Sequence, residues 1–358
     1  MHWAKTRSRA RFNLATSGVG PHPLRELRYA PEQLEINGDN SYGFPPLIQA
    51  IADRFGVDAD SVVTTAGTSM ANYLAFATIL EPADEVLIEH PTYALLIDAL
   101  RYIGAELKIF ERREEAGYAV DPMEVRRTIT PKTKLVVLTN LHNPSSVLTS
   151  NAVLQQIGEI ANSVGARILV DEVYLDAVYE NTPRTSFHLG PQFVVTGSLT
   201  KVYGLSGLRC GWILAPPDLV RAMWHLNNIL GSTPVHPGEL LSLAAFHQLD
   251  QIREKWRAVV DADRGLLTDF LNQESRISAV RTRFGTTSFL HLRDGDVEKF
   301  LMLLREDFET SAVPGRFFGG RNHFRIGMGV NAEMFGEGLK RIRAALDSSK
   351  AGDVSANA

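Results

Sequence analysis

The sequence has little of what marks several classes of protein. It carries one cysteine, Cys210, so an intramolecular disulfide is excluded, which fits a reducing cytoplasm. Its 37 basic and 41 acidic residues nearly balance and gather into neither a basic stripe nor an acidic tail. We therefore expect no nucleic-acid partner, and a small molecule becomes the first ligand class to consider.

Long apolar runs are also lacking. No stretch approaches the length that crosses a membrane, and the basic residues 1–11 contain no apolar core of a signal peptide. We expect no membrane partner and a cytoplasmic location. The 358 residues, of which 44% are hydrophobic, nevertheless suffice for a large core and for two domains.

What the sequence does contain is a regular alternation. Between Ser61 and Trp212, short β-rich runs alternate with stretches in which apolar residues recur at three- and four-residue spacing. This pattern is typical of an α/β fold with a mainly parallel sheet sandwiched by helices. Strands are predicted at 61–65, 85–89, 106–110, 134–139, 167–170, 193–197 and 212–214. Helices are predicted at 71–80, 93–103, 121–129 and 151–164.

The pattern changes after Pro237. A helical stretch reaches to about Asn272, longer than a typical globular helix, so we expect it to bridge two lobes or to break once. A smaller α+β region follows, with strands predicted at 288–292, near 312 and at 324–327, and helices at 297–308 and 331–346. The small, polar residues 348–358 are expected to form a disordered tail.

Ligands of open α/β sheets bind outside the carboxyl ends of the strands, so the residues that follow each strand are candidates. The first strand is followed by Gly67, Thr68 and Ser69, which also begin a helix. Backbone N–H groups, two hydroxyls and the positive end of a helix dipole could bind a phosphate there. Taken alone, a segment of this kind is more often an ordinary helix cap.

Three further strand ends carry polar or aromatic side chains. Tyr93 could lie against an aromatic ring, although a tyrosine at a helix start is more often simply packed. Asn143 could donate its amide N–H to a ligand oxygen, or belong to an ordinary turn before Pro144. Asp171 emerges from an apolar strand, where a carboxylate is costly unless it meets a cation such as a protonated pyridine nitrogen. Tyr174 could reach the same ring, and a turn-capping aspartate is the ordinary alternative.

The segment from Ser198 to Trp212 is the most informative. It combines Ser198, Lys201 and Arg209 with several glycines. Lysine can form an imine with an aldehyde, while a hydroxyl and a guanidinium can hold a phosphate dianion. By itself Lys201 could be a solvated surface lysine. The whole segment suits an aldehyde cofactor that bears a phosphate.

Read in order, these segments resemble the class I and II aminotransferases, which are fold type I enzymes dependent on pyridoxal 5′-phosphate (PLP). The likeness runs from Asn13-Leu14 to residues 324–327. It rests on Ser198-x-x-Lys201 with the glycines and Arg209-x-Gly after it, on Asn143-Pro144, on Asp171 with Tyr174, and on Tyr42-Gly43-Phe44-Pro45-Pro46-Leu47. One departure is Ser146, because the family commonly has glycine two residues after that proline. The turn there is therefore expected to differ.

The resemblance implies a large PLP-binding domain at 38–250 and a small domain built from 1–37 and 251–347. It implies that Lys201 forms the imine with PLP, the internal aldimine, and that Asp171 pairs with the pyridine nitrogen. Asn143 and Tyr174 would bind the ring oxygen, and Tyr93 would stack on the ring.

The remaining implied contacts concern the phosphate and the substrate. Phosphate ligands would be Gly67, Thr68, Ser198 and Arg209, joined by Tyr42 from the other subunit of a homodimer. Substrate would be bound through its carboxylate by Arg325, with help from Gly18 and Asn143. No metal is expected.

The implied reaction moves an amino group between an L-amino acid and a 2-oxo acid, with Lys201, Asp171 and Tyr174 as catalytic residues. A neutral or aromatic donor is favoured, because residues 231–237 and 68–70, where dicarboxylate-specific members commonly place a second cation, contain no lysine or arginine. Arg316 or Arg25 could still supply one. Two alternatives stay open: a PLP-dependent lyase, cyclase or synthase on the same scaffold, and a non-catalytic PLP- or ligand-binding regulator.

Overall fold

A seven-stranded sheet forms the centre of the computed structural model, which describes residues 2–355, without the side chains of 2, 4 and 349–355. The strand order is β2-β8-β7-β6-β5-β3-β4, and only β8 runs antiparallel to its neighbours. This confirms the predicted α/β class and mainly parallel sheet. The strands are β2 (Val62–Ala66), β3 (Glu85–His90), β4 (Glu106–Glu111), β5 (Thr133–Thr139), β6 (Arg167–Asp171), β7 (Phe193–Ser198) and β8 (Cys210–Leu214).

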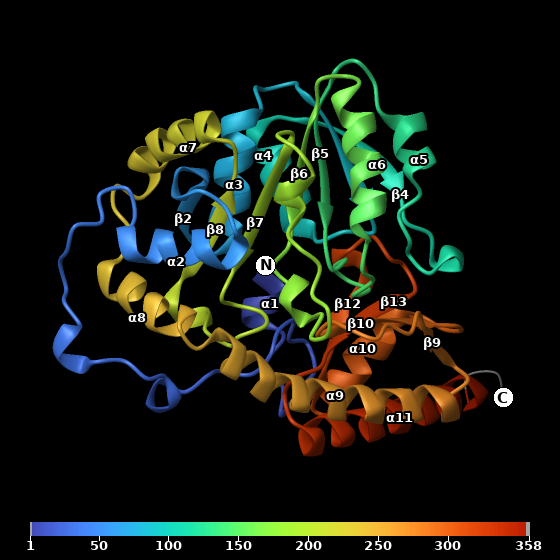
Figure 1. Cartoon of the computed structure of the whole chain (residues 1–358). Coiled ribbons are helices and arrows are strands. Elements are labelled where there is room, and N and C mark those ends of the chain that lie inside the picture. Colours follow the sequence, from blue (N-terminus) through green and yellow to red (C-terminus); the bar gives the residue numbers. More distant parts are fainter. Residues whose placement is uncertain (1, 356–358) are drawn as a thin grey trace.

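Helices cover both faces of this sheet (Figure 1). Successive strand residues point to opposite faces, so Val137 packs with α3, α4 and α7 while Val136 packs with α5 and α6. The helices α2 and α8 extend the second layer over β7 and β8. The bounds are α2 (Pro45–Phe55), α3 (Thr68–Ile79), α4 (Ala94–Ile103), α5 (Pro122–Thr128), α6 (Asn151–Asn162), α7 (Pro217–Leu230) and α8 (His236–Phe246).

Local sequence signals explain where several of these helices begin and end. The Asp121 carboxylate accepts from Met123 N at 2.9 Å before α5, and Ser150 Oγ accepts from Val153 N at 3.3 Å before α6. At the other end, Gly56 and Gly104 close α2 and α4 in the left-handed conformation. Such caps keep the connections short and place the strand ends.

A second, four-stranded antiparallel sheet has the order β12-β13-β10-β9. Its strands are β9 (Ile277–Ala279), β10 (Thr287–Leu292), β12 (Val313–Pro314) and β13 (His323–Gly327), and it packs with α10 (Val297–Glu306) and α11 (Ala332–Ser355). This is the smaller α+β region that the sequence predicted. The proposed domain boundaries remain a prediction.

The long helical stretch after Pro237 is broken once, as one of the two expectations stated. It ends α8 at Phe246 and resumes as α9 (Leu249–Gln273). The second helix also bridges, because Trp256 belongs to the core beside the large sheet and Leu267 to the core beside the small one. In Figure 1, α9 runs from α8 to lie alongside α11.

The beginning of the chain lies against its end. Strand β1 (Phe12–Asn13) pairs in parallel with β11 (Thr310–Ser311), and Gly327 N donates to Leu14 O at 2.8 Å. Before β1 lies α1 (His2–Thr6). Short 3₁₀ helices lie at Leu24–Glu26, Pro31–Gln33, Ala59–Ser61, Glu114–Ala116, Leu175–Ala177, Ser186–Leu189, Ser206–Leu208 and Gly315–Phe317.

One expectation about the end of the chain is corrected. Backbone 348–355, predicted to be disordered, continues α11 as helix to Ser355, and 356–358 lie outside the described residues. No proline follows Leu346 to stop the helix, and alanine, serine and lysine tolerate it. Of the helices in the described part of the chain, none combines the length and apolar character needed to span a bilayer.

Candidate active site

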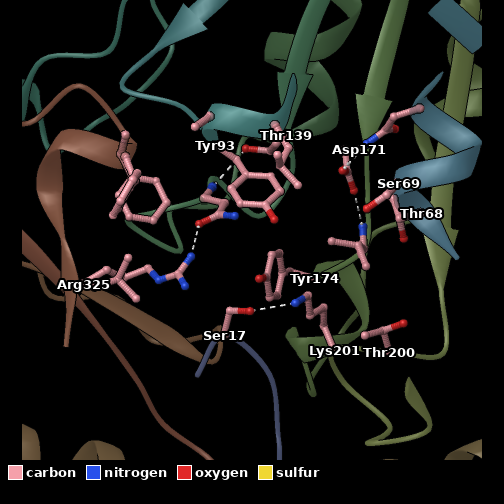
Figure 2. A pocket seen from close by; sticks show the side chains of 18 of the residues that line it. Ser17, Thr68, Ser69, Tyr93, Thr139, Asp171, Tyr174, Thr200, Lys201 and Arg325 are labelled. Carbon is pink, nitrogen blue, oxygen red and sulfur yellow. Dashed lines mark hydrogen bonds between the residues drawn. The ribbon is translucent and has the colours of Figure 1, made fainter. Parts of the chain in front are cut away.

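One cavity of about 330 Å³ lies between the carboxyl ends of the large sheet's parallel strands and the four-stranded sheet (Figure 2). Parallel strands end at one edge, which brings together residues far apart in the sequence. Of the predicted site residues, those that line the cavity are Thr68, Tyr93, Asn143, Asp171, Tyr174, Ser198, Lys201, Arg209 and Arg325.

Lys201 lies three residues after β7 and is half-buried. Its Nζ donates to Ser17 Oγ at 2.7 Å, a contact visible in Figure 2. Gly18 lies beside the lysine backbone rather than in the cavity wall, since a Cβ there would come within 2.6 Å of Lys201 O. Val19 N donates to the same oxygen at 2.9 Å. Ser17 was missed, because an isolated serine in a loop carries no distinctive signal.

Asp171 ends β6 and is buried. Its Oδ2 accepts from Asn72 Nδ2 at 2.9 Å and its Oδ1 from Val173 N at 3.1 Å. Burial raises the pKa of Asp171 to about 6, against the lowering by these hydrogen bonds and by Lys201. Asn72 is a second missed residue, although its place one turn after Thr68 on α3 puts both on the same helix face. A cation beside Asp171 would relieve the cost of burying its charge.

Four predicted groups form a cradle at the start of α3. Gly67 has a φ of 86°, and a Cβ there would come within 2.5 Å of Arg209 Nη2. That guanidinium is held by Ala66 O at 2.7 Å. Thr68 Oγ1 is buried without a hydrogen-bond partner among the described residues, and Ser198 lies nearby in the cavity wall. A helix N-terminus, an unpaired hydroxyl and a guanidinium fit a phosphate.

Two tyrosines, Tyr93 and Tyr174, point into the cavity (Figure 2). Tyr93 precedes α4, and burial raises its pKa to about 12, helped by Tyr174 and opposed by Arg325. Tyr174 is also buried. A flat aromatic ring and a phenol at these places suit a heterocycle with a phosphate tail and a ring oxygen. The residues present therefore fit PLP.

Arg325 stands on the opposite wall, on β13. Its Nη1 donates to Asn143 Oδ1 at 2.8 Å, and its guanidinium carbon lies 4.8 Å from the centre of the Phe318 ring. Burial lowers the pKa of Arg325, and its Nε has no hydrogen-bond partner among the described residues. A buried guanidinium with a free donor can bind a carboxylate.

Aromatic side chains complete this second wall, and sequence reasoning missed them. Trp3 and Phe317 lie with ring centres 5.7 Å apart, and Phe318 packs beside them. The cationic side chains among the described lining residues are Lys201, Arg209 and Arg325. Arg316 and Arg25, which the sequence offered as further sources of a cation, do not line the cavity. Arg316 pairs with Glu298, and Arg25 lies elsewhere.

Tyr42 does not line this cavity. It is 52% exposed and meets Trp224 edge-on, with ring centres 5.8 Å apart. Because its predicted contact is with another subunit, a single chain leaves that role a prediction.

The expected difference at Ser146 is confined to its side chain. Ser146 adopts a φ of 63°, the left-handed conformation that favours glycine. Its Oγ donates to Thr287 O at 2.8 Å, which ties the loop to β10. The backbone turn is thus of the kind a glycine would form, with an added anchor.

A cluster outside the cavity contains three possible metal ligands. Glu114 Oε2 lies 3.0 Å from His291 Nδ1 and 3.1 Å from His323 Nε2. The two imidazoles stack, however, with centres 4.4 Å apart and planes 23° apart. Ring nitrogens bind metals in the ring plane, so nearly parallel rings cannot both address one ion without turning. The cluster is a hydrogen-bonded link between the segment after β4 and the four-stranded sheet.

Known proteins resemble this chain over most of its length. The family model "Aminotransferase class I and II" matches residues 26–342. An aspartate aminotransferase of Streptomyces avermitilis is 27% identical over 86% of this chain and 81% of its own. Capreomycidine synthase of Streptomyces vinaceus is 29% identical over 98% of this chain and 94% of its own.

A solved structure agrees with these relatives. The PLP-dependent aminotransferase from Streptococcus suis superposes with a TM-score of 0.90 at 26% identity, covering 95% of this chain and 94% of the other. Family match, fold and cavity chemistry point the same way. The chain belongs to the class I and II aminotransferases and is a PLP-dependent enzyme that transfers amino groups between amino acids and 2-oxo acids.

Proposed function

We propose that the amino donor is a neutral or aromatic L-amino acid and that Lys201 is the residue that binds the cofactor aldehyde. The observation that carries the proposal is the convergence of Lys201, Asp171 and Arg325 on one cavity. They supply an amine, an anion and a carboxylate-binding cation.

The polar wall would hold the cofactor. Phosphate contacts would come from Gly67, Thr68, Ser198 and Arg209. The Thr68 hydroxyl, which finds no partner in the described part of the chain, supports this assignment. Tyr93 would lie against the ring, and Asn143 and Tyr174 would donate to its oxygen. Bound PLP supplies an electron sink for the negative charge that develops at the substrate α-carbon.

Two residues would handle protons. Asp171 keeps a proton on the ring nitrogen, since a buried carboxylate with a raised pKa gains from a cationic partner. The Lys201 Nζ, held by Ser17 Oγ at 2.7 Å, is placed to accept the proton of the substrate α-carbon. Both roles are independent of the substrate side chain.

The second wall would select the donor. Arg325 binds the α-carboxylate with Asn143 and the backbone near Gly18 beside it, and the Nε without a partner among the described residues supports this. The side chain would then meet Trp3, Phe317 and Phe318. Because these rings offer no counter-charge to a distal carboxylate, an apolar side chain is favoured over that of aspartate.

We further propose a homodimer in a cytoplasmic protein. A second cavity of about 180 Å³, lined in part by Val235, lies behind Arg209. The large apolar residues that are exposed include Val235, Tyr42 and Ile229. Apolar exposure of this kind suits contact with another copy, from which Tyr42 would reach the phosphate.

The test is an amino-donor screen followed by an oxo-acid screen. Purified protein loaded with PLP is mixed with phenylalanine, leucine, alanine or aspartate, and the visible absorbance of the bound cofactor is followed. We expect loss with phenylalanine, leucine and alanine, and recovery when a 2-oxo acid is added. Fastest loss with aspartate would overturn the proposed donor class, and borohydride trapping at a residue other than Lys201 would overturn its role.

A second candidate is a PLP-dependent synthase, favoured by the match to capreomycidine synthase along almost the whole chain. The same screen separates the two. A synthase would consume amino acid while the visible absorbance returns without any added oxo acid.

A further inference from the structure

A buried ion pair lies behind the cavity, outside its lining. Arg112 Nη1 donates to Glu89 Oε2 at 2.8 Å, and both side chains are 0% exposed. The guanidinium is further held by Tyr118 O at 2.7 Å. Burial raises the pKa of the Glu89 carboxyl, whereas the Arg112 charge and the hydrogen bonds from Thr139 lower it. We take Glu89 as ionised because the guanidinium beside it stays charged, and its oxygens can then only accept.

Hydrogen bonds connect the second oxygen of Glu89 to the cavity wall. Glu89 Oε1 accepts from both the backbone N and the Oγ1 of Thr139, each at 2.7 Å. Thr139 Oγ1 in turn accepts from Asn143 N at 2.9 Å, and Asn143 Oδ1 accepts from Arg325 Nη1 at 2.8 Å.

The direction of these bonds is fixed by the carboxylate. A hydroxyl has one proton, and Thr139 must give it to Glu89 because that partner cannot donate. A Thr139 lone pair is therefore always turned toward Asn143 N. The Glu89 charge thus orients the loop that carries Asn143. Glu89 does not itself line the cavity where cofactor and substrate would bind.

We propose that Glu89, held by Arg112, is a positioning residue that acts through Thr139 to orient Asn143 and Arg325 toward cofactor and substrate. The proposal rests on the roles given to Asn143 and Arg325 under the proposed function. The alternative is a pair that only stabilises the sheet.

The chain offers a matched control for that alternative. At the other end of the same strands, Thr133 Oγ1 on β5 donates to Glu85 on β3, and Glu85 pairs with Lys108 on β4 at 2.9 Å. Thr133 and Glu85 are buried too. This group likewise joins a threonine hydroxyl, a glutamate carboxylate and a cation, here the partly exposed Lys108, but it lies at the edge of the sheet away from the cavity.

The experiment compares Thr139→Val, Thr139→Ser and Thr133→Val in the PLP-loaded enzyme. We expect Thr139→Val to raise KM for phenylalanine about 3- to 10-fold, the worth of one hydrogen bond, with kcat little changed. The pH midpoint of the bound cofactor's absorbance change should rise by about half a unit, because a displaced Asn143 donates less well to the negative ring oxygen. Thr139→Ser should restore both values.

Thr133→Val should lower the melting temperature of the protein. It should change neither the pH midpoint of the cofactor's absorbance nor the KM for phenylalanine. An unchanged midpoint and KM in Thr139→Val, or equal shifts in Thr133→Val, would overturn the proposal. Glu89→Gln has one amide oxygen, which the charged Arg112 guanidinium takes, so its NH₂ group faces Thr139 and no longer accepts from the Thr139 hydroxyl. This variant should therefore reproduce Thr139→Val.

Crystal structures of the wild type and of Thr139→Val without cofactor give an independent readout. The Asn143–Arg325 contact should be lost in the variant and kept in Thr133→Val. If the wild type failed to bind PLP, the proposed function would fall, while these structures would still decide the positioning role.

Discussion

The two walls of the cavity are built in different ways. One consists of residues that follow the parallel strands of the large sheet, such as Asp171 and Lys201, and its polar groups are tied by hydrogen bonds to the backbone and to Asn72 and Ser17. The other comes from α1, from the turn before β13 and from β13 itself, and it sets Arg325 among aromatic rings.

The difference teaches how the enzyme divides its work. Every amino donor shares an α-proton, an amine and a carboxylate, and donors differ only in their side chains. Changes in the polar wall should therefore affect all donors alike, whereas changes in the aromatic part of the other wall should distinguish one donor from another.

The largest effect is expected for Lys201→Ala. Loss of the amine should lower kcat by at least about 10⁴-fold for every donor, because one group serves both as the cofactor's attachment and as the base. Turnover measured with phenylalanine, leucine and alanine checks this, and circular dichroism should show a folded protein. Wild-type-like activity with any donor would contradict the division between the walls.

Arg325→Ala is expected to act mainly on binding. Removing the cation that receives the carboxylate should reduce kcat/KM by about 10³-fold, or about 4 kcal/mol, chiefly through KM. The loss should be similar for phenylalanine and alanine, since both carry the α-carboxylate. A variant that discriminates strongly between them would show that Arg325 belongs to side-chain selection instead.

The pH dependence of stability should reveal Asp171. Its folded pKa of about 6 lies above the usual 3.8, so the folded protein binds this proton more tightly than the unfolded chain. Without cofactor, the wild type should lose stability relative to Asp171→Asn as the pH rises from about 4 to 6, by about 3 kcal/mol at most. Urea unfolding across this range measures it.

Added PLP should reduce that loss, because a cation beside Asp171 lowers its pKa. A constant difference between the two proteins from pH 4 to 7 would mean that Asp171 titrates normally.

Trp3→Ala should give the smallest and most selective effect. Removing the indole from the aromatic wall should lower kcat/KM for phenylalanine about 10-fold, with less than about 2-fold change for alanine. Progress curves of wild type and variant with both donors test this, at a temperature where both proteins stay folded. Equal losses for the two donors would place Trp3 outside side-chain selection.

The polar wall could be predicted from the sequence and most of the other could not. Thr68, Asn143, Asp171 and Lys201 each follow a predicted strand within a few residues, so strand period and topology were enough to bring them to one edge. Trp3 and Phe317 come from opposite ends of the chain and resemble ordinary core residues by type. Arg325 was identified only by resemblance.

Prediction of the fold from the sequence was likewise successful for some elements and not for others. Most strands of the large sheet are largely apolar runs bounded by turn residues, whereas the edge strand β4 alternates apolar with charged residues. All seven strands were predicted. The break between α8 and α9 was one of two options, because it falls at His247 and Gln248, where neither a proline nor a glycine marks the end of a helix. The extension of α11 beyond Leu346 depends on propensities too weak to decide from sequence alone.

The passage of residues 14–20 between the two sheets has a consequence for biosynthesis. Val19 N donates to Lys201 O, Gly20 N to Gly329 O and Gly327 N to Leu14 O. This segment therefore completes its hydrogen bonds only after residues 327–329 have been synthesised. The nascent enzyme can assemble its large sheet first, but it gains a finished catalytic centre only when its last strand arrives.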